Sequence, residues 1–150
     1  MVKAVLLAGG LGTRLREETE YRPKPMVEVG GRPILWHIMK GFAHHGISDF
    51  VVCTGYRGEV IKDFFLFYEG RTHDFTVRLG QPAEVTYHSA HDESGWQVTV
   101  ADTGQTTMTG GRVKRIQDHI GDERFMVTYG DGLADVDIPA LLDFHESHGR

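Results

Sequence analysis

The feature that most restricts the fold is an apolar run near the N-terminus that ends at two glycines. Residues 4–8 are all apolar, Val2 is apolar too, and Gly9 and Gly10 precede a polar stretch over residues 11–21. An unbroken apolar run of this length is typical of a strand that is buried on both faces of a parallel sheet. We therefore expect a central strand that runs directly into a long loop.

The next segments alternate between helical and strand patterns. After Pro33, which can occupy the first turn of a helix, apolar residues recur at three- and four-residue spacing until Gly46. Residues 50–54 form another apolar run typical of an interior strand, and a second helical spacing over residues 60–67 ends near Gly70. This order predicts an α/β, Rossmann-like fold with a mixed, mostly parallel sheet and helices on both faces.

The second half of the chain opens with a different pattern. Between residues 75 and 102, apolar residues alternate in short stretches divided by polar turns, which indicates a ribbon or an edge of the sheet. A helix is predicted over residues 112–120, a buried strand over residues 124–129, and an amphipathic helix over residues 140–148, opened by Pro139. Another strand should follow, so we expect residues 1–150 to be a domain truncated before its end.

Composition disfavours several classes of protein. A chain of 150 residues with 40% hydrophobic residues suits one globular domain, and 21 acidic against 16 basic residues leave no basic tract for binding nucleic acid. The N-terminal apolar run is too short for a signal peptide or a membrane span. The one cysteine, Cys53, lies in an apolar run and suggests a small buried side chain. We expect a soluble, cytoplasmic protein without nucleic acid or membrane partners.

The glycine-rich loop after the first strand is the strongest candidate for a binding site. Its glycines permit positive φ and close approach of the main chain, so successive amides can face a phosphate or a base edge. Arg14 adds a fixed fork of donors for phosphate oxygens. A plain tight turn is the alternative that a glycine pair alone would fit equally well. The candidate residues are Leu7, Ala8, Gly9, Gly10, Leu11, Gly12, Thr13 and Arg14.

Familiar motifs of other enzyme classes do not fit this chain. A Gly-x-Gly-x-x-Gly pattern that starts at Gly10 fails because Leu15 stands at the third glycine position. A P-loop motif does not occur, and neither does the Gly-x-Ser-x-Gly elbow of many hydrolases. An NAD enzyme, a P-loop NTPase and a serine hydrolase are therefore all disfavoured.

Lys24 is the second candidate for contact with phosphate. It stands between Pro23 and Pro25, which fix φ and favour an extended backbone before each ring. A stiff segment loses less conformational entropy when its ammonium group binds an anion. The alternative is a solvated lysine in a proline-rich loop.

These motifs together resemble the sugar-1-phosphate nucleotidyltransferase family, over all 150 residues. The glycine-rich motif is the one that specifies the family, and the two motifs around residues 102–112 point to its cytidylyl branch. The motifs are Leu7-Ala8-Gly9-Gly10-Leu11-Gly12-Thr13-Arg14-Leu15, Pro23-Lys24-Pro25-Met26, Gly31-Arg32-Pro33-Ile34-Leu35, Asp102-Thr103-Gly104, Met108-Thr109-Gly110-Gly111-Arg112 and Thr128-Tyr129-Gly130-Asp131-Gly132.

The resemblance implies a reaction and a set of partners. The expected activity is transfer of a cytidylyl group from CTP to glucose 1-phosphate, which gives CDP-glucose and pyrophosphate by in-line attack on the α-phosphorus with Mg²⁺ as cofactor. A uridylyl- or thymidylyltransferase and a catalytically silent nucleotide-sugar sensor remain alternatives. Association into a homo-oligomer and the identity of the sugar stay open.

The resemblance also implies roles for particular residues. Arg14 and Lys24 would be catalytic, the loop from Leu7 to Arg14 would hold the nucleotide together with Lys24 and Gly130, and Asp131 would bind the metal. Thr107 and Arg112 would contact the cytidine nucleotide from a loop after residue 104. A carboxylate at the carboxyl end of a buried strand can coordinate a hard cation, although Asp-Gly is also a common turn. In the family the sugar-binding half comes later, so residues 1–150 correspond to the nucleotide-binding part, with an incomplete site.

Overall fold

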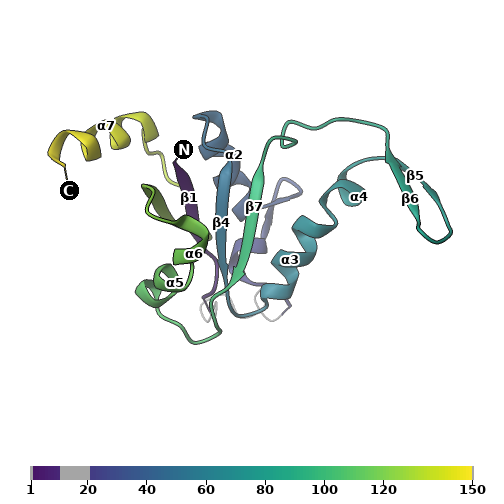
Figure 1. Ribbon diagram of the computed structural model, residues 1–150, viewed down its shortest axis with the longest axis horizontal. Helices are drawn as coiled ribbons and strands as arrows, with labels where there is room; N and C mark the ends of the chain where they lie inside the picture. Colours follow the sequence, from purple (N-terminus) through teal and green to yellow (C-terminus); the bar gives the residue numbers. More distant parts are fainter. Residues whose placement is uncertain (1, 11–20, 150) are drawn as a thin grey trace.

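The computed structural model describes residues 2–10 and 21–149, and its centre is a four-stranded parallel sheet (Figure 1). The strands are β1 (Lys3–Leu7), β4 (Asp49–Thr54), β7 (Gln97–Asp102) and β8 (Phe125–Tyr129), in the spatial order β7-β4-β1-β8. The predicted central strand is confirmed, because β1 pairs with β4 on one side and with β8 on the other.

Helices cover both faces of the sheet, as predicted. Side chains alternate along a strand, so Leu6 faces one side of β1 and Val5 the other. Leu6 packs in a core with α2 (Ile34–His44) and α3 (Gly58–Leu66). Val5 packs with Ile116 and Ile120, which belong to the segment of α5 (Thr109–Arg115) and α6 (Gln117–Ile120).

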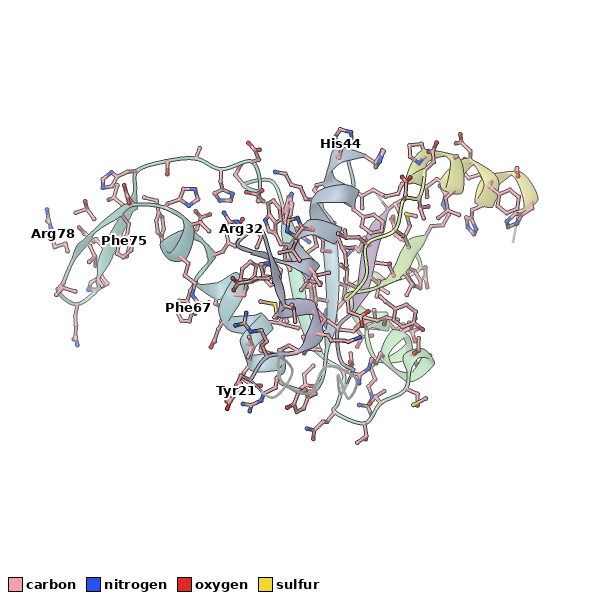
Figure 2. The ribbon with its side chains drawn as sticks, turned by 180° about the vertical axis from the view of Figure 1, so that it is seen from behind. Tyr21, Arg32, His44, Phe67, Phe75 and Arg78 are labelled. Carbon is pink, nitrogen blue, oxygen red and sulfur yellow. The ribbon has the colours of Figure 1, made fainter. Side chains whose placement is uncertain are left out.

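Antiparallel pairing is confined, among the described residues, to two hairpins outside the central sheet. One joins β2 (Glu28–Val29) to β3 (Arg32–Pro33), and the other joins β5 (Phe75–Arg78) to β6 (Glu84–Tyr87). Figures 1 and 2 show the second hairpin, which carries the labelled Phe75 and Arg78, projecting away from the rest of the chain. Residues 75–102 thus supply both a ribbon and an edge strand, β7.

Several predicted helices differ in detail. The helix predicted to end near Gly70 is two helices, because Phe67, with φ −105° and ψ 17°, separates α3 from α4 (Tyr68–Thr72). Ile116, with φ −99° and ψ 12°, divides α5 from α6 in the same way. One such residue interrupts the helix without disturbing the apolar spacing, so the pattern could not reveal either break. Pro33 lies one position before α2, in extended conformation.

The strand predicted as buried over residues 124–129 is half-exposed. On the face shared with Val5, the side chains of Phe125, Val127 and Tyr129 are 37%, 46% and 62% exposed. The reason is position: β8 is an edge of the sheet in the described part of the chain, and the core of that face is formed on β1 and β4. An apolar sequence cannot distinguish an edge from the centre.

The last helix, α7 (Ile138–His148), begins as predicted with Pro139 in its first turn. The side chain of Asp137 caps it by accepting a hydrogen bond of 2.9 Å from the backbone N–H of Ala140. α7 buries Ile138 and leaves Phe144 exposed. Among the described helices, none has the length and apolar character needed to span a bilayer.

Candidate active site

A pocket of about 390 Å³ lies at the carboxyl ends of β1 and β8. The chain order moves outward from β1 to β4 and β7 and then returns to β8 on the opposite side of β1. In open α/β sheets, ligands bind at such a reversal of strand order, beyond the carboxyl ends of the strands. Figure 2 shows Tyr21, the first described residue after the glycine-rich loop, at the opposite end of the molecule from His44. The pocket is lined by Leu7, Ala8, Gly9, Gly10, Lys24, Pro25, Thr107, Met108, Thr109, Arg112, Tyr129 and Asp131.

This lining brings together most of the residues that the sequence singles out. The first four loop residues, from Leu7 to Gly10, meet Lys24, Thr107, Arg112 and Asp131 there. Gly130 lies directly behind the loop, because its N–H donates a 3.0 Å hydrogen bond to the carbonyl oxygen of Leu7. The other predicted loop residues, Leu11, Gly12, Thr13 and Arg14, lie outside the described residues.

Lys24 and Asp131 face each other across the pocket. The Lys24 Nζ is 3.4 Å from the Asp131 Oδ2, and both side chains are partly open to solvent. Pro23 is extended, with φ −69° and ψ 151°, but Lys24 begins a short 3₁₀ helix, η1 (Lys24–Met26), rather than continuing the predicted extended segment. A hydrogen bond from the N–H of Val27 to the Lys24 carbonyl closes this turn. Because exposed ion pairs contribute little, each partner can exchange the other for a ligand.

Arg112 holds the strand ends together beneath the pocket. The sequence predicts it both at the start of a helix and in a nucleotide-binding loop; it lies in α5, which begins after the extended residue Met108. Its side chain is buried, and burial lowers the pKa of the guanidinium group. Oxygen acceptors within the protein satisfy the charge. They are the carbonyl oxygens of Gly9, Thr54, Gly104 and Gln105 and the hydroxyl oxygen of Thr103, at 2.7–3.4 Å.

Four pocket residues lack a role in the sequence-based prediction. Pro25, Met108 and Thr109 belong to the motifs that carry the resemblance, so their motifs were the available signal. Tyr129 belongs to such a motif too and was predicted as a strand residue, and its place beside Gly130 at the strand end was the signal. The sequence offered nothing that marks Arg115, which contacts the loop over residues 103–107.

Asp131 is the only carboxylate in the described lining of the pocket. In residues 2–10 and 21–149, no group of three or more His, Cys, Asp or Glu side chains is arranged to hold a metal ion. A magnesium ion is commonly bound by one or two carboxylates, with substrate phosphates and water as its other ligands. The residues present therefore fit Mg²⁺ that arrives together with a phosphorylated substrate.

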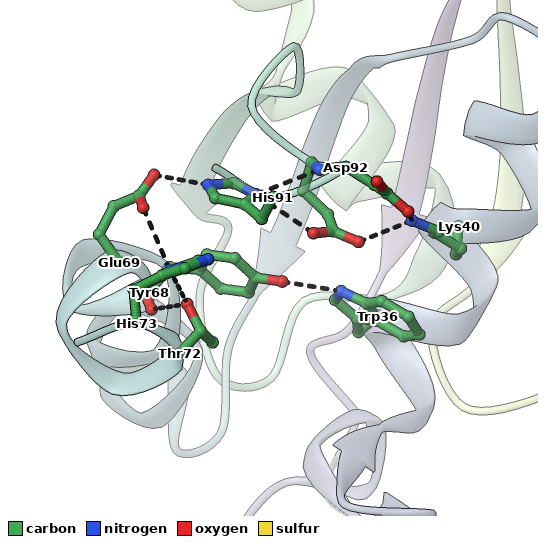
Figure 3. Close-up of polar contacts among 9 residues, drawn as sticks. Trp36, Lys40, Tyr68, Glu69, Thr72, His73, His91 and Asp92 are labelled. Carbon is green, nitrogen blue, oxygen red and sulfur yellow. Dashed lines mark hydrogen bonds and ion pairs between the residues drawn. The ribbon is translucent and has the colours of Figure 1, made fainter. Parts of the chain in front are cut away.

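A second cavity, of about 530 Å³, lies between the α3–α4 segment and β7. Figure 3 shows the polar network on its rim, in which His91 lies between Glu69 of α4 and Glu93, and Lys40 of α2 pairs with Glu93. The hydrogen bond of 2.7 Å to Glu69 is the main reason why the pKa of His91 is raised. The polar groups of this rim are paired with one another, so the cavity offers a ligand mainly its apolar floor.

The chain matches a family model in sequence, and it matches several proteins in sequence or structure. The Nucleotidyl transferase model matches residues 3–150. A glucose-1-phosphate cytidylyltransferase of Salmonella typhimurium is 53% identical over 150 residues, which cover 99% of this chain and 58% of that protein. A probable glucose-1-phosphate cytidylyltransferase of Bacillus subtilis is 42% identical over 156 residues and is covered to 57%. The chain thus spans somewhat over half the length of these relatives.

Solved structures support the same architecture. HddC from Yersinia pseudotuberculosis, in complex with GMP-PN, superposes with a TM-score of 0.70 at 24% identity, over 97% of this chain and 54% of that one. A UDP-glucose pyrophosphorylase in complex with UDP-glucose superposes with a TM-score of 0.69 at 19% identity, over 99% and 55% of the two chains. At these identities the likeness establishes the fold.

Proposed function

The chain belongs to the nucleotidyl transferase family, and we propose that its pocket holds the CTP of a reaction that forms CDP-glucose and pyrophosphate from CTP and glucose 1-phosphate. The observation that carries the proposal is the meeting of Gly9, Lys24 and Asp131 in one pocket at the sheet reversal. The choice of CTP and glucose 1-phosphate is supported by the 53% identity to the Salmonella typhimurium enzyme.

The reaction we propose is an in-line displacement at the α-phosphorus. A phosphate oxygen of glucose 1-phosphate attacks the α-phosphorus of CTP, and the bond to the β-phosphate oxygen breaks as pyrophosphate leaves. The protein forms no covalent bond. Its residues hold the two substrates in line and stabilise the charge that moves to pyrophosphate.

The described residues divide this work between them. Lys24, placed by the η1 turn, directs its ammonium group to the phosphate oxygens once it leaves Asp131. The backbone of Gly10 approaches the nucleotide closely because the residue carries no β-carbon, whereas the missing β-carbon of Gly9 makes room for Arg112. Asp131 would hold Mg²⁺, and the chemistry that this ion supplies when bound is neutralisation of phosphate charge. Arg14, outside the described residues, is proposed to stabilise the leaving pyrophosphate.

Thr107 and Arg112 are proposed to act on the base side of the nucleotide. Both line the pocket. The hydroxyl group of Thr107 is available for direct contact, whereas the acceptors around the Arg112 guanidinium suggest that its main contribution is to hold Gly9 and the loop after β7 in place.

The test is turnover by the full-length protein. Pyrophosphate release would be measured with glucose 1-phosphate and, in turn, CTP, UTP and dTTP. We expect CTP to be used best. Faster release with UTP or dTTP would assign the protein to another branch of the family, and absence of release with all three would favour a nucleotide-sugar sensor.

A further inference from the structure

The side chain of Arg115 closes the loop that leads from β7 to α5. Arg115 is the last residue of α5, and its Nη1 donates hydrogen bonds to the carbonyl oxygen of Thr103, at 2.6 Å, and to the Oγ1 of Thr107, at 2.8 Å. One guanidinium group therefore spans the beginning and the end of the loop. Thr107 is one of two residues of this loop that line the nucleotide pocket, and the other is Met108.

Two glycines leave the space that this arrangement needs. Gly104 has φ +89°, a conformation that favours glycine, and a β-carbon there would clash with the Arg115 guanidinium and lie 2.7 Å from the Thr107 Oγ1. A β-carbon at Gly111 would lie 2.8 Å from the Thr107 Cγ2. The hydroxyl and the methyl group of Thr107 are thus each confined by a glycine, so its rotamer is set by packing as well as by Arg115.

Arg112 and Arg115 bind the same loop from two sides. Arg112 reaches the Thr103 hydroxyl and the Gly104 carbonyl, whereas Arg115 reaches the Thr103 carbonyl. After burial, the positive charge of Arg115 is among the causes that lower the pKa of Arg112. Two arginines three residues apart on a helix repel each other, and the loop oxygens offset this cost.

The bond from Arg115 favours one of the two roles that the Thr107 hydroxyl can play. A hydroxyl group has one donor hydrogen and two acceptor lone pairs. Because Arg115 can only donate, it occupies an acceptor position of Oγ1 and leaves the hydroxyl hydrogen for another acceptor. Cytosine presents an acceptor at N3, whereas uracil and thymine present an N–H donor at that position.

We propose that Arg115 is a positioning residue for base selection: by donating to Thr107, it orients the threonine hydroxyl as a donor that suits cytosine and opposes uracil and thymine. This inference rests on the proposed cytidylyltransferase function. It adds a residue that touches no substrate and acts through Thr107.

The test compares the full-length wild type with R115M in pyrophosphate release from CTP and from UTP. We expect R115M to lower kcat/KM for CTP relative to UTP by roughly tenfold, the size of effect that follows from one hydrogen bond. The loss should lie mainly in KM, with kcat for CTP largely retained. R115K, which keeps one donor, should recover part of the preference. The matched control is K114M, which removes the same charge from the neighbouring exposed residue of α5.

A second comparison tests whether Arg115 acts through Thr107. T107V should lose the same preference, and the double variant R115M/T107V should lose little more than either single variant. Equal losses for CTP and UTP in R115M would indicate a merely structural role and overturn the inference. If the wild type prefers CTP, an unchanged ratio of kcat/KM for CTP to that for UTP in R115M would also overturn it. A wild type that prefers UTP would overturn the proposed function and this inference together.

Discussion

A β-carbon added at Gly9 would fall on the guanidinium group of Arg112. The two residues are joined by a 2.8 Å hydrogen bond from the Arg112 Nη2 to the Gly9 carbonyl, and 103 positions separate them in the chain. The first glycine of the nucleotide loop is thus required by a side chain beneath it. For its neighbour Gly10, no described residue other than its chain neighbours has an atom within 4 Å of the corresponding position.

The contact between Gly9 and Arg112 predicts a large difference in stability between two alanine variants. Gly9→Ala should destabilise the full-length protein by ~2 kcal/mol or more, because the new methyl group displaces a buried guanidinium from its acceptors. Gly10→Ala is the matched control and should change stability little. Urea unfolding of both variants provides the measurement, and equal midpoints would contradict the contact.

Lys24→Ala and Arg14→Ala should each lower kcat more than they weaken binding of CTP. Their charges act most strongly where negative charge develops on the leaving pyrophosphate, so the expected loss is ~10²–10³ in rate for each. Single-turnover kinetics, together with equilibrium binding of CTP to the full-length variants, separates the two effects. A near-normal rate in either variant would remove that residue from the mechanism.

Asp131→Asn should abolish turnover while the fold persists. Asparagine keeps the size of the side chain but lacks the negative charge that a hard cation requires. The lost pair with Lys24 is partly exposed, so the melting temperature of the full-length protein should change little. Turnover would be measured against magnesium concentration. Partial rescue at high magnesium supports the assignment, and a magnesium dependence like that of the wild type would refute it.

His91 should make the stability of the protein depend on pH. Its pKa is raised, chiefly by the hydrogen bond with Glu69, so the folded state binds its proton more tightly than the unfolded state does. The resulting stabilisation is fully present below the unfolded pKa of about 6.5 and is lost as pH rises through the higher folded pKa. Glu69 and Glu93 raise the pKa and burial lowers it; His73 lies beside the ring, and Lys40 pairs with Glu93.

The measurement is the difference in unfolding free energy between the full-length wild type and His91→Gln as pH rises. This difference should shrink as pH rises above the unfolded pKa of about 6.5 and through the higher folded pKa. A constant difference for His91→Gln would show that the network of Figure 3 does not hold a proton.

The fold could be predicted to the extent that it depends on local apolar patterns. The spacing that became α2 has the period of a helix, and the runs that became β1 and β4 are short and unbroken and end at glycines, which favours buried strands. The breaks at Phe67 and Ile116 could not be predicted, since they leave the period unchanged. The exposure of β8 depends on which neighbours a strand acquires, and its own sequence does not contain that information.

The candidate site shows the same limit. Residues such as Lys24 and Asp131 could be named because flanking prolines or glycines marked them. Their pairing over 107 positions follows from β8 lying beside β1, which is a property of the sheet order. Arg115 has no local mark at all, and its importance is visible only once the loop after β7 is folded against α5.

The reactivity of Cys53 can report how often the central strands of the sheet separate. It is the one cysteine among the 150 residues, it lies in β4 between β1 and β7, and it is fully buried. Burial raises the pKa of its thiol to about 11, so the reactive thiolate is scarce at neutral pH even when a reagent reaches it. Alkylation of Cys53 must therefore wait for the strands to part, and its rate measures how often this happens. A nucleotide bound at the strand ends should lower the rate of Cys53 alkylation without touching the sulfur atom.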